Sequence, residues 1–159
     1  NLSDSGTLLS LILMLIGGSP GSTAGGLKTT TIAVVVIAVF AMAKGGDDIN
    51  TFKRRIVSDV VKQSAVIILI YLFAVMLSSM IICSVEGLGM SQVLFETASA
   101  AGTVGVSKGI TNQISAISKI ILMIMMYGGR IGGLSLVLVF GQRKPEAPVK
   151  RPTEQILIG

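Results

Sequence analysis

The segment GTVGVS at residues 102–107 is the first place where residue types and spacing indicate chemistry. A cation that leaves water must receive oxygens in exchange, and rings of backbone carbonyls supply them in ion filters. Glycine is needed in such a strand, because aiming successive carbonyls at one axis requires φ values that other residues disfavour. We therefore predict a filter strand formed by Thr103, Val104, Gly105 and Val106. The alternative is an ordinary external loop.

A second unusual segment covers residues 17–26, where five of ten residues are glycine. Pro20 removes a backbone donor and disrupts a helix. We predict a broken helix whose polar peptide serves as a gate or a binding loop. A loose helix contact through small residues is the alternative. A phosphate loop is excluded, since Leu27 interrupts the required spacing before Lys28. The predicted gating loop consists of Gly17, Gly18, Ser19, Pro20, Gly21, Ser22, Thr23, Ala24, Gly25 and Gly26.

Two charged residues lie in apolar surroundings. Arg130 falls near the middle of an apolar stretch, where a charge must face a cavity or find partners. We expect it to contact the gating loop, either as part of a gate or as a structural tie between helices. Glu96 has two possible roles, holding the filter backbone or facing the outer interface, and the sequence favours the second.

No set of residues suggests covalent chemistry. The chain has one cysteine and no histidine, which excludes disulfide frameworks and histidine-ligated metals. Since neither an acid–base pair nor a nucleophile set is present, we expect no enzymatic activity and no bound cofactor.

The elements that position these residues are expected to lie in a membrane. The chain has 159 residues, of which 51% are hydrophobic and 13% charged. The mean hydropathy of +0.81 and the low charge are unlike a soluble domain, where about a quarter of residues are charged. In a membrane protein the net charge of +5 sets the orientation of the membrane segments, so we expect no nucleic-acid partner.

The first residue is Asn1, with no signal-peptide pattern after it, and we expect a fragment of a longer protein.

Three regions are long enough to cross a bilayer core of about 30 Å, which needs about 20 apolar residues. Residues 65–85 carry no charge, residues 8–43 are broken in the middle, and residues 115–140 hold only Lys119 and Arg130. Basic residues gather in 44–62 and 143–151, which are expected to be cytoplasmic, while 86–114 is external. The apolar stretch at residues 90–101 is too short to span the membrane, and its length predicts a re-entrant helix. The apolar spacing within 47–62 suits an amphipathic helix on the inner surface.

The first and last spans resemble each other. LILMLIGG at 11–18 aligns with LMIMMYGG at 122–129, and each is followed by a second Gly-Gly-Leu marker. Repeats with one glycine-interrupted copy are typical of transporters and pores. Chance similarity between apolar, glycine-containing helices is the alternative.

Together these motifs resemble the Trk/Ktr/HKT superfamily of potassium transporters, and most closely a KtrB-type subunit. The resemblance rests on GGSPGSTAGGLKTTT at 17–31, GTVGVS at 102–107 and GGRIGGLS at 128–135. It implies an all-α membrane protein of helix–pore-helix–helix repeats in the cell membrane, with K⁺ as the transported ion, held by filter carbonyls, and possible Na⁺ coupling. Gly105 would be a filter glycine, residues 17–26 the intramembrane gating loop, and Arg130 the arginine that contacts it.

The resemblance also implies the domain order and the partners. Residues 1–43 would be the second membrane helix of one repeat, broken at 17–26, and 44–63 a cytoplasmic connector. Residues 64–141 would form a complete repeat with a helix at 64–85, a pore helix at 90–101, the filter at 102–108 and a helix at 115–141. Residues 142–159 would be a cytoplasmic tail. The implied partners are the rest of a four-repeat pore subunit, a cytosolic nucleotide-binding ring, a second subunit in a homodimer, and lipid.

Two rival interpretations make different structural predictions. A secondary transporter that binds another solute at its broken helix predicts no re-entrant helix before Thr103. A structural or assembly subunit predicts a continuous helix through residues 17–26.

Overall fold

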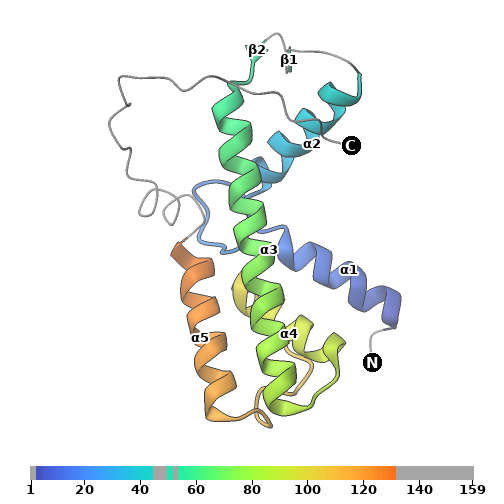
Figure 1. Ribbon diagram of the computed structural model, residues 1–159, viewed down its shortest axis with the longest axis vertical. Helices are drawn as coiled ribbons and strands as arrows, with labels where there is room; N and C mark the ends of the chain where they lie inside the picture. Colours follow the sequence, from blue (N-terminus) through green and yellow to red (C-terminus); the bar gives the residue numbers. More distant parts are fainter. Residues whose placement is uncertain (1–2, 45–49, 52–53, 132–159) are drawn as a thin grey trace, which may run out of the picture.

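The computed structural model describes residues 3–44, 50–51 and 54–131 and contains five helices there (Figure 1). They are α1 (Asp4–Leu15), α2 (Thr29–Ala43), α3 (Ser58–Glu86), α4 (Met90–Gly102) and α5 (Ala116–Ile131). Two strands of two residues each, β1 (Asn50–Thr51) and β2 (Arg54–Arg55), pair antiparallel between α2 and α3. The predicted all-α class is confirmed apart from this short pair.

Helix α3 is the central element and the one helix of the described residues that is long and apolar enough to cross a membrane. Its 29 residues span about 44 Å at 1.5 Å per residue, which exceeds a hydrocarbon core of about 30 Å. It ends at Gly87, whose φ of 64° is left-handed and whose amide donates to the Cys83 carbonyl. Helices α1 and α2 are shorter apolar helices.

The first apolar region is not one helix. Helix α1 ends at Leu15 and α2 begins at Thr29, with a non-helical stretch between them that forms the loop beside α3 in Figure 1. The continuous helix required by the structural-subunit interpretation is therefore not present.

Helix α4 is short and is buried among the other helices. It packs against α5, α3 and α1, and its residues 95–102 are all buried. Thr97 and Ser79 of α3 are fully buried and share a hydrogen bond of 2.6 Å, so the polar side chains of α4 find partners inside the bundle. A short helix before Thr103 is the feature that the secondary-transporter interpretation did not predict.

The connector differs from the predicted amphipathic helix at 47–62. Asn50 pairs with Arg55 and Thr51 with Arg54, while the helical part starts only at Ser58. Asn and Thr are weak helix formers, and the local backbone pairing overrides the 3.6-residue apolar spacing. The helix prediction is therefore wrong for residues 50–51 and 54–57. Residues outside the described part are 45–49 and 52–53 of the connector, 132–141 of the predicted helix at 115–141, and the tail at 142–159.

The two Gly-Gly copies of the proposed repeat have different conformations. Gly17 and Gly18 follow the end of α1, whereas Gly128 and Gly129 lie inside α5. The first pair is followed by Ser19 and Pro20, and proline does not continue a helix.

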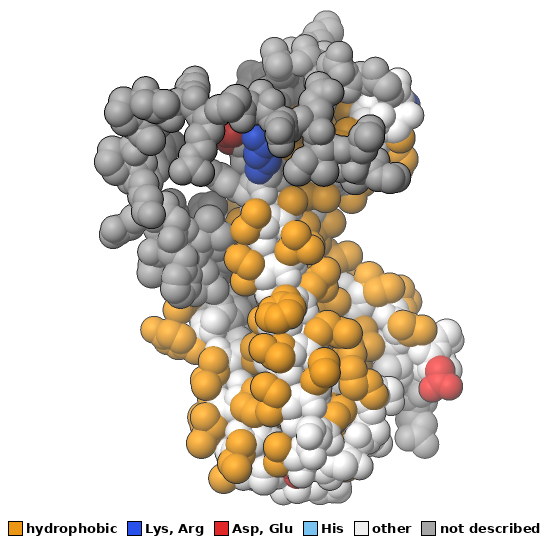
Figure 2. All heavy atoms as spheres, viewed as in Figure 1, with side chains coloured by type: hydrophobic (Ala, Val, Ile, Leu, Met, Phe, Trp, Pro, Cys, Tyr) orange, Lys and Arg blue, Asp and Glu red, His pale blue; other side chains and the backbone are white. Residues whose placement is uncertain are grey.

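Large apolar side chains cover the outer surface of the molecule. Figure 2 shows them along the helices on the viewed face. Five of those on α3 are between 45% and 69% exposed: Leu69, Ile70, Phe73, Leu77 and Met80. A surface of this kind is suited to lipid or to further protein, and not to water. The chain is thus an all-helical membrane protein.

A close backbone contact joins α5 to the end of α4. A Cβ atom added to Gly129 would lie 1.9 Å from the Ala101 carbonyl oxygen, whereas a Cβ atom on Gly128 would meet nothing within 4 Å. Glycine at position 129 is therefore required for the observed approach of the two helices.

This contact predicts opposite effects at two adjacent glycines. Gly129→Ala should lower the thermal stability of the detergent-solubilised protein, because overpacking of this kind costs about 1–3 kcal/mol. Gly128→Ala should be neutral or stabilising, because alanine improves helix propensity by about 1 kcal/mol. Melting curves followed by size-exclusion chromatography would measure both, and equal melting temperatures for the two variants would contradict the observed packing.

Candidate functional site

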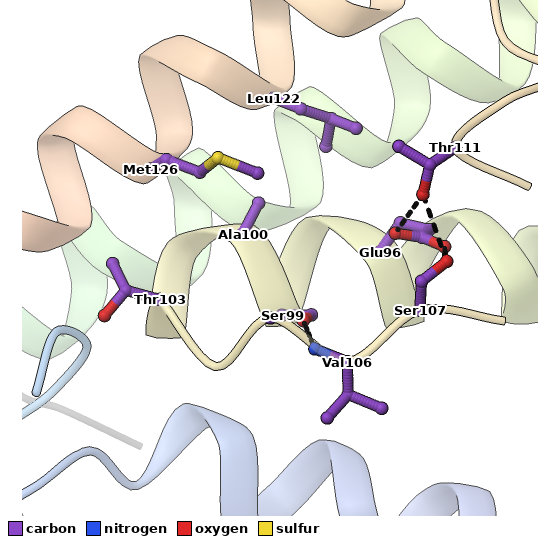
Figure 3. Close-up of a pocket in the computed structure, with 10 residues that line it drawn as sticks. Glu96, Ser99, Ala100, Thr103, Val106, Ser107, Thr111, Leu122 and Met126 are labelled. Carbon is purple, nitrogen blue, oxygen red and sulfur yellow. Dashed lines mark hydrogen bonds between the residues drawn. The ribbon is translucent and has the colours of Figure 1, made fainter. Parts of the chain in front are cut away.

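The predicted filter strand begins where α4 ends. After Gly102 the chain leaves the helix, and Figure 3 shows it running back along α4. The amide of Val104 donates to the Ser99 carbonyl at 3.0 Å, and the amide of Val106 donates to the Ser99 hydroxyl at 3.0 Å. Two alternate amides of the strand are thus tied to one residue of α4. Gly105 between them has a φ of 82°, which favours glycine.

Thr103 joins the helix to the strand. Its φ of 53° and ψ of 37° are left-handed, and it is the one non-glycine residue with positive φ in the described part of the chain. A β-branched residue is rarely found there, since the conformation costs about 1–2 kcal/mol. The carbonyl end of α4 carries the negative end of the helix dipole, which favours a cation nearby.

Glu96 does not face the outer interface, so that prediction is wrong. Glu96 is only 7% exposed, and its carboxylate accepts hydrogen bonds from the Lys108 amide at 3.1 Å and the Thr111 hydroxyl at 3.3 Å. The Ser107 hydroxyl also donates to it (Figure 3). Glu96 and Ser99 are three residues apart and so share a helix face. The loop that follows, at residues 103–111, is rich in hydroxyl side chains and backbone amides that need acceptors. Two polar acceptors on one helix face beside such a loop are the sequence signal that could have predicted these contacts.

Lys108 fixes the far end of the same loop. Its ammonium group lies 5.2 Å from the centre of the Phe95 ring and donates to the Thr7 hydroxyl of α1 at 3.2 Å. The segment that follows α4 is therefore held by backbone and side-chain contacts at both ends.

A cavity of about 380 Å³ lies between this segment and α5. Ser99, Thr103 and Glu96 line it on the α4 side, with Leu122 and Met126 on the α5 side (Figure 3). No group of three His, Cys, Asp or Glu side chains with metal-binding geometry occurs among the described residues.

The segment predicted as the gating loop folds back on itself. The Gly17 amide donates to the Leu27 carbonyl at 2.7 Å, and the Thr29 amide donates to the Gly18 carbonyl at 3.3 Å. These bonds close the base of the loop, where residues 25–27 are buried, and leave residues 19–24 exposed. The tip is held by few contacts, one of which is the 2.6 Å bond from the Lys28 ammonium group to the Ala24 carbonyl.

The base of this loop contacts the start of the strand. The Gly25 amide donates to the Thr103 hydroxyl at 2.9 Å. A Cβ atom on Gly25 would lie 2.5 Å from that hydroxyl oxygen, so no side chain fits. Two segments 78 residues apart in the sequence therefore touch directly.

Arg130 reaches the tip of the loop. Its guanidinium group, on the last turn of α5, donates to the Thr23 carbonyl. The side chain is exposed in the described part of the chain. The structure thus brings together the three groups of site residues named from the sequence: the strand at 103–106, the loop at 17–26 and Arg130.

Comparison with known proteins identifies the family. Residues 1–150 match the TrkH family, described as cation transport proteins. The chain is 37% identical over 158 residues to the Ktr system potassium uptake protein D of Bacillus subtilis, covering 99% of this chain and 35% of that protein. It is 36% identical over 169 residues to the potassium/sodium uptake protein NtpJ of Enterococcus hirae, covering 99% and 36%. It is 32% identical over 152 residues to the Ktr system potassium uptake protein B of Vibrio alginolyticus, covering 96% and 33%.

The chain spans about a third of the length of these curated relatives. The match covers the broken first region, α3, α4 and α5 in one continuous alignment. The chain belongs to the TrkH family of cation transport proteins.

Proposed function

We propose that this chain is part of the ion-conducting subunit of a potassium uptake system. Residues 103–106 would supply one side of a filter in which K⁺ exchanges water for backbone carbonyl oxygens. Residues 17–26 would form a gate on the inner side of that filter, and Arg130 would hold the gate. The names of the relatives support potassium as the ion, and one of them includes sodium.

The observation that carries this proposal is the double anchoring of the strand to Ser99. With the Val104 and Val106 amides both engaged on the α4 side, the backbone oxygens are the groups left for an ion. Backbone carbonyls replace a hydration shell only when they are held in place. Ser99 provides that support for the strand itself, and Glu96 holds the segment directly after it through Ser107 and Lys108.

The driving force would be the membrane potential, which is worth about 2.3 kcal/mol per charge for each 100 mV. No covalent step is required, because the ion is only dehydrated, moved and rehydrated. The protein would therefore act as a transporter and not as an enzyme.

One filter strand cannot surround an ion, so the proposed pathway requires partners. These would be the remaining repeats of a four-repeat pore subunit, a cytosolic nucleotide-binding ring that controls the gate, and a second subunit in a homodimer. The protein would be multi-pass in the cell membrane, with its basic C-terminal tail in the cytoplasm.

The filter is tested by comparing two glycines with similar backbone conformations. Gly105 and Gly109 have φ values of 82° and 86°, and both have open space around them. Gly105→Ser should reduce K⁺ uptake and its discrimination against Na⁺, because serine disfavours the φ that the strand needs. Gly109→Ser carries the same strain outside the strand and should leave discrimination unchanged. Uptake of K⁺, Rb⁺ and Na⁺ would be measured in cells lacking their own potassium uptake.

Unchanged uptake and selectivity in the Gly105→Ser protein, at normal expression, would rule out the filter assignment. A loss of selectivity in both variants would attribute the effect to the whole loop and not to the strand.

The support of the strand through the segment that follows it is tested at Glu96. Glu96→Gln should lower K⁺/Na⁺ selectivity, because the amide group replaces one acceptor oxygen with a donor and leaves a hydroxyl or an amide unpaired. Glu86 is a matched control, since its carboxylate accepts from the Ser115 amide at 2.9 Å and from the hydroxyls of Ser115 and Ser118 at 2.5 Å. Glu86→Gln should affect stability without changing selectivity. Equal selectivity in both variants would show that Glu96 does not support the strand.

The gate is tested by removing its contacts. Arg130→Ala, or deletion of residues 19–24, should raise K⁺ flux several-fold, because an exposed hydrogen bond contributes on the order of 1 kcal/mol to the closed position. Lys119→Ala removes an exposed cation of the same helix that makes no contact with the loop among the described residues, and flux should stay at the normal level. A fall in flux for Arg130→Ala, with normal expression, would show that the arginine does not close the pathway.

A further inference from the structure

The side chain of Thr103 belongs to the filter strand and to the gating loop at once. Its backbone lies in the left-handed region that a threonine rarely adopts. Its amide donates to the Ala100 carbonyl at 3.1 Å, and its hydroxyl accepts from the Gly25 amide at 2.9 Å. The hydroxyl is therefore part of what keeps this residue in its unusual conformation.

The contact is equally specific from the side of the loop. Gly25 is buried, and a Cβ atom at this position would lie 2.5 Å from the Thr103 hydroxyl oxygen and 2.7 Å from its methyl carbon. The loop can leave this position only by breaking the Gly25–Thr103 bond. Likewise, Thr103 can change its side-chain conformation only by leaving a buried backbone donor unpaired.

We propose that Thr103 is a positioning residue that couples the gating loop to the filter strand through its hydroxyl. This coupling rests on the proposed function of the two segments. Displacement of the loop would release Thr103 and alter the inner end of the strand. By thermodynamic reciprocity, an ion bound at the strand would also change the stability of the closed loop.

Neighbouring Tyr71 provides a contrast. Its hydroxyl is buried beside the same loop, 3.5 Å from the position of a Cβ atom on Gly26, but it has no hydrogen-bond partner among the described residues. Removing this hydroxyl breaks no hydrogen bond of the loop among the described residues. It therefore serves as a control for a general loosening of the packing.

The test uses the full-length protein in membranes, with Leu27→Cys as a reporter at the buried base of the loop and other cysteines, including Cys83, replaced. The rate at which a water-soluble methanethiosulfonate reagent modifies this cysteine is measured with and without K⁺. Thr103→Val and Thr103→Gly remove the acceptor, and glycine also tolerates the left-handed conformation. Thr103→Ser retains the acceptor.

We expect the Val and Gly variants to raise the modification rate about fivefold, as for the loss of one hydrogen bond, and to abolish its dependence on K⁺. The Ser variant and Tyr71→Phe should keep the rate and the K⁺ dependence of the parent. If Thr103→Val fails to fold, the Gly and Ser variants decide the outcome.

A Gly variant with the parental rate and K⁺ dependence would overturn the coupling, as would a Ser or Tyr71→Phe variant that behaves like the Gly variant. The experiment distinguishes failure of this coupling from failure of the proposed function. Absence of K⁺ uptake by the parent protein, with the loop still released in the Gly variant, would leave the Gly25–Thr103 contact standing and remove only potassium as the ion. Normal uptake with no release would remove the coupling alone.

Discussion

The close approach of backbones at the C-terminal end of α4 is the constraint on which the rest of this structure depends. At this point α5 contacts the Ala101 carbonyl through Gly129, and the loop contacts Thr103 through Gly25. A side chain at either glycine would collide with atoms of α4 or of Thr103. Because neither glycine has room for a Cβ atom, the positions of the strand, the loop and the last turn of α5 are set together.

The two halves of the site are held with different strength. The strand and the segment after it are supported by side chains from buried α4, where hydrogen bonds are electrostatically strong and costly to leave unmade. The loop tip is exposed, and the side chains of Lys28 and Arg130 hold it by donating hydrogen bonds to its backbone carbonyls. Segments with few buried contacts open at low free energy, whereas well-packed ones open only with the whole structure. This difference is suited to the roles proposed above, a fixed filter and a movable gate.

Much of the architecture was predictable from local sequence signals. The length and lack of charge of residues 65–85 indicated the span that α3 forms, and Pro20 with its glycines indicated the break between α1 and α2. The short apolar stretch before Thr103 indicated α4. The connector was mispredicted because apolar spacing alone does not report backbone pairing, and β1 and β2 are held by that pairing. The role of Glu96 was misjudged because a carboxylate is normally exposed unless hydrogen-bond donors surround it, and those donors come from the tertiary structure.

The sequence by itself determined where helices are possible and where they must break, since these depend on hydrophobic length, on proline and on glycine. It also singled out Arg130, because a charge in an apolar stretch needs a partner. Only the tertiary structure decided which partners are met. The Gly25–Thr103 hydrogen bond joins residues 78 positions apart, and the three donors of Glu96 lie on a segment that returns along α4. Such contacts depend on how the helices pack, and no local pattern of residues encodes that geometry.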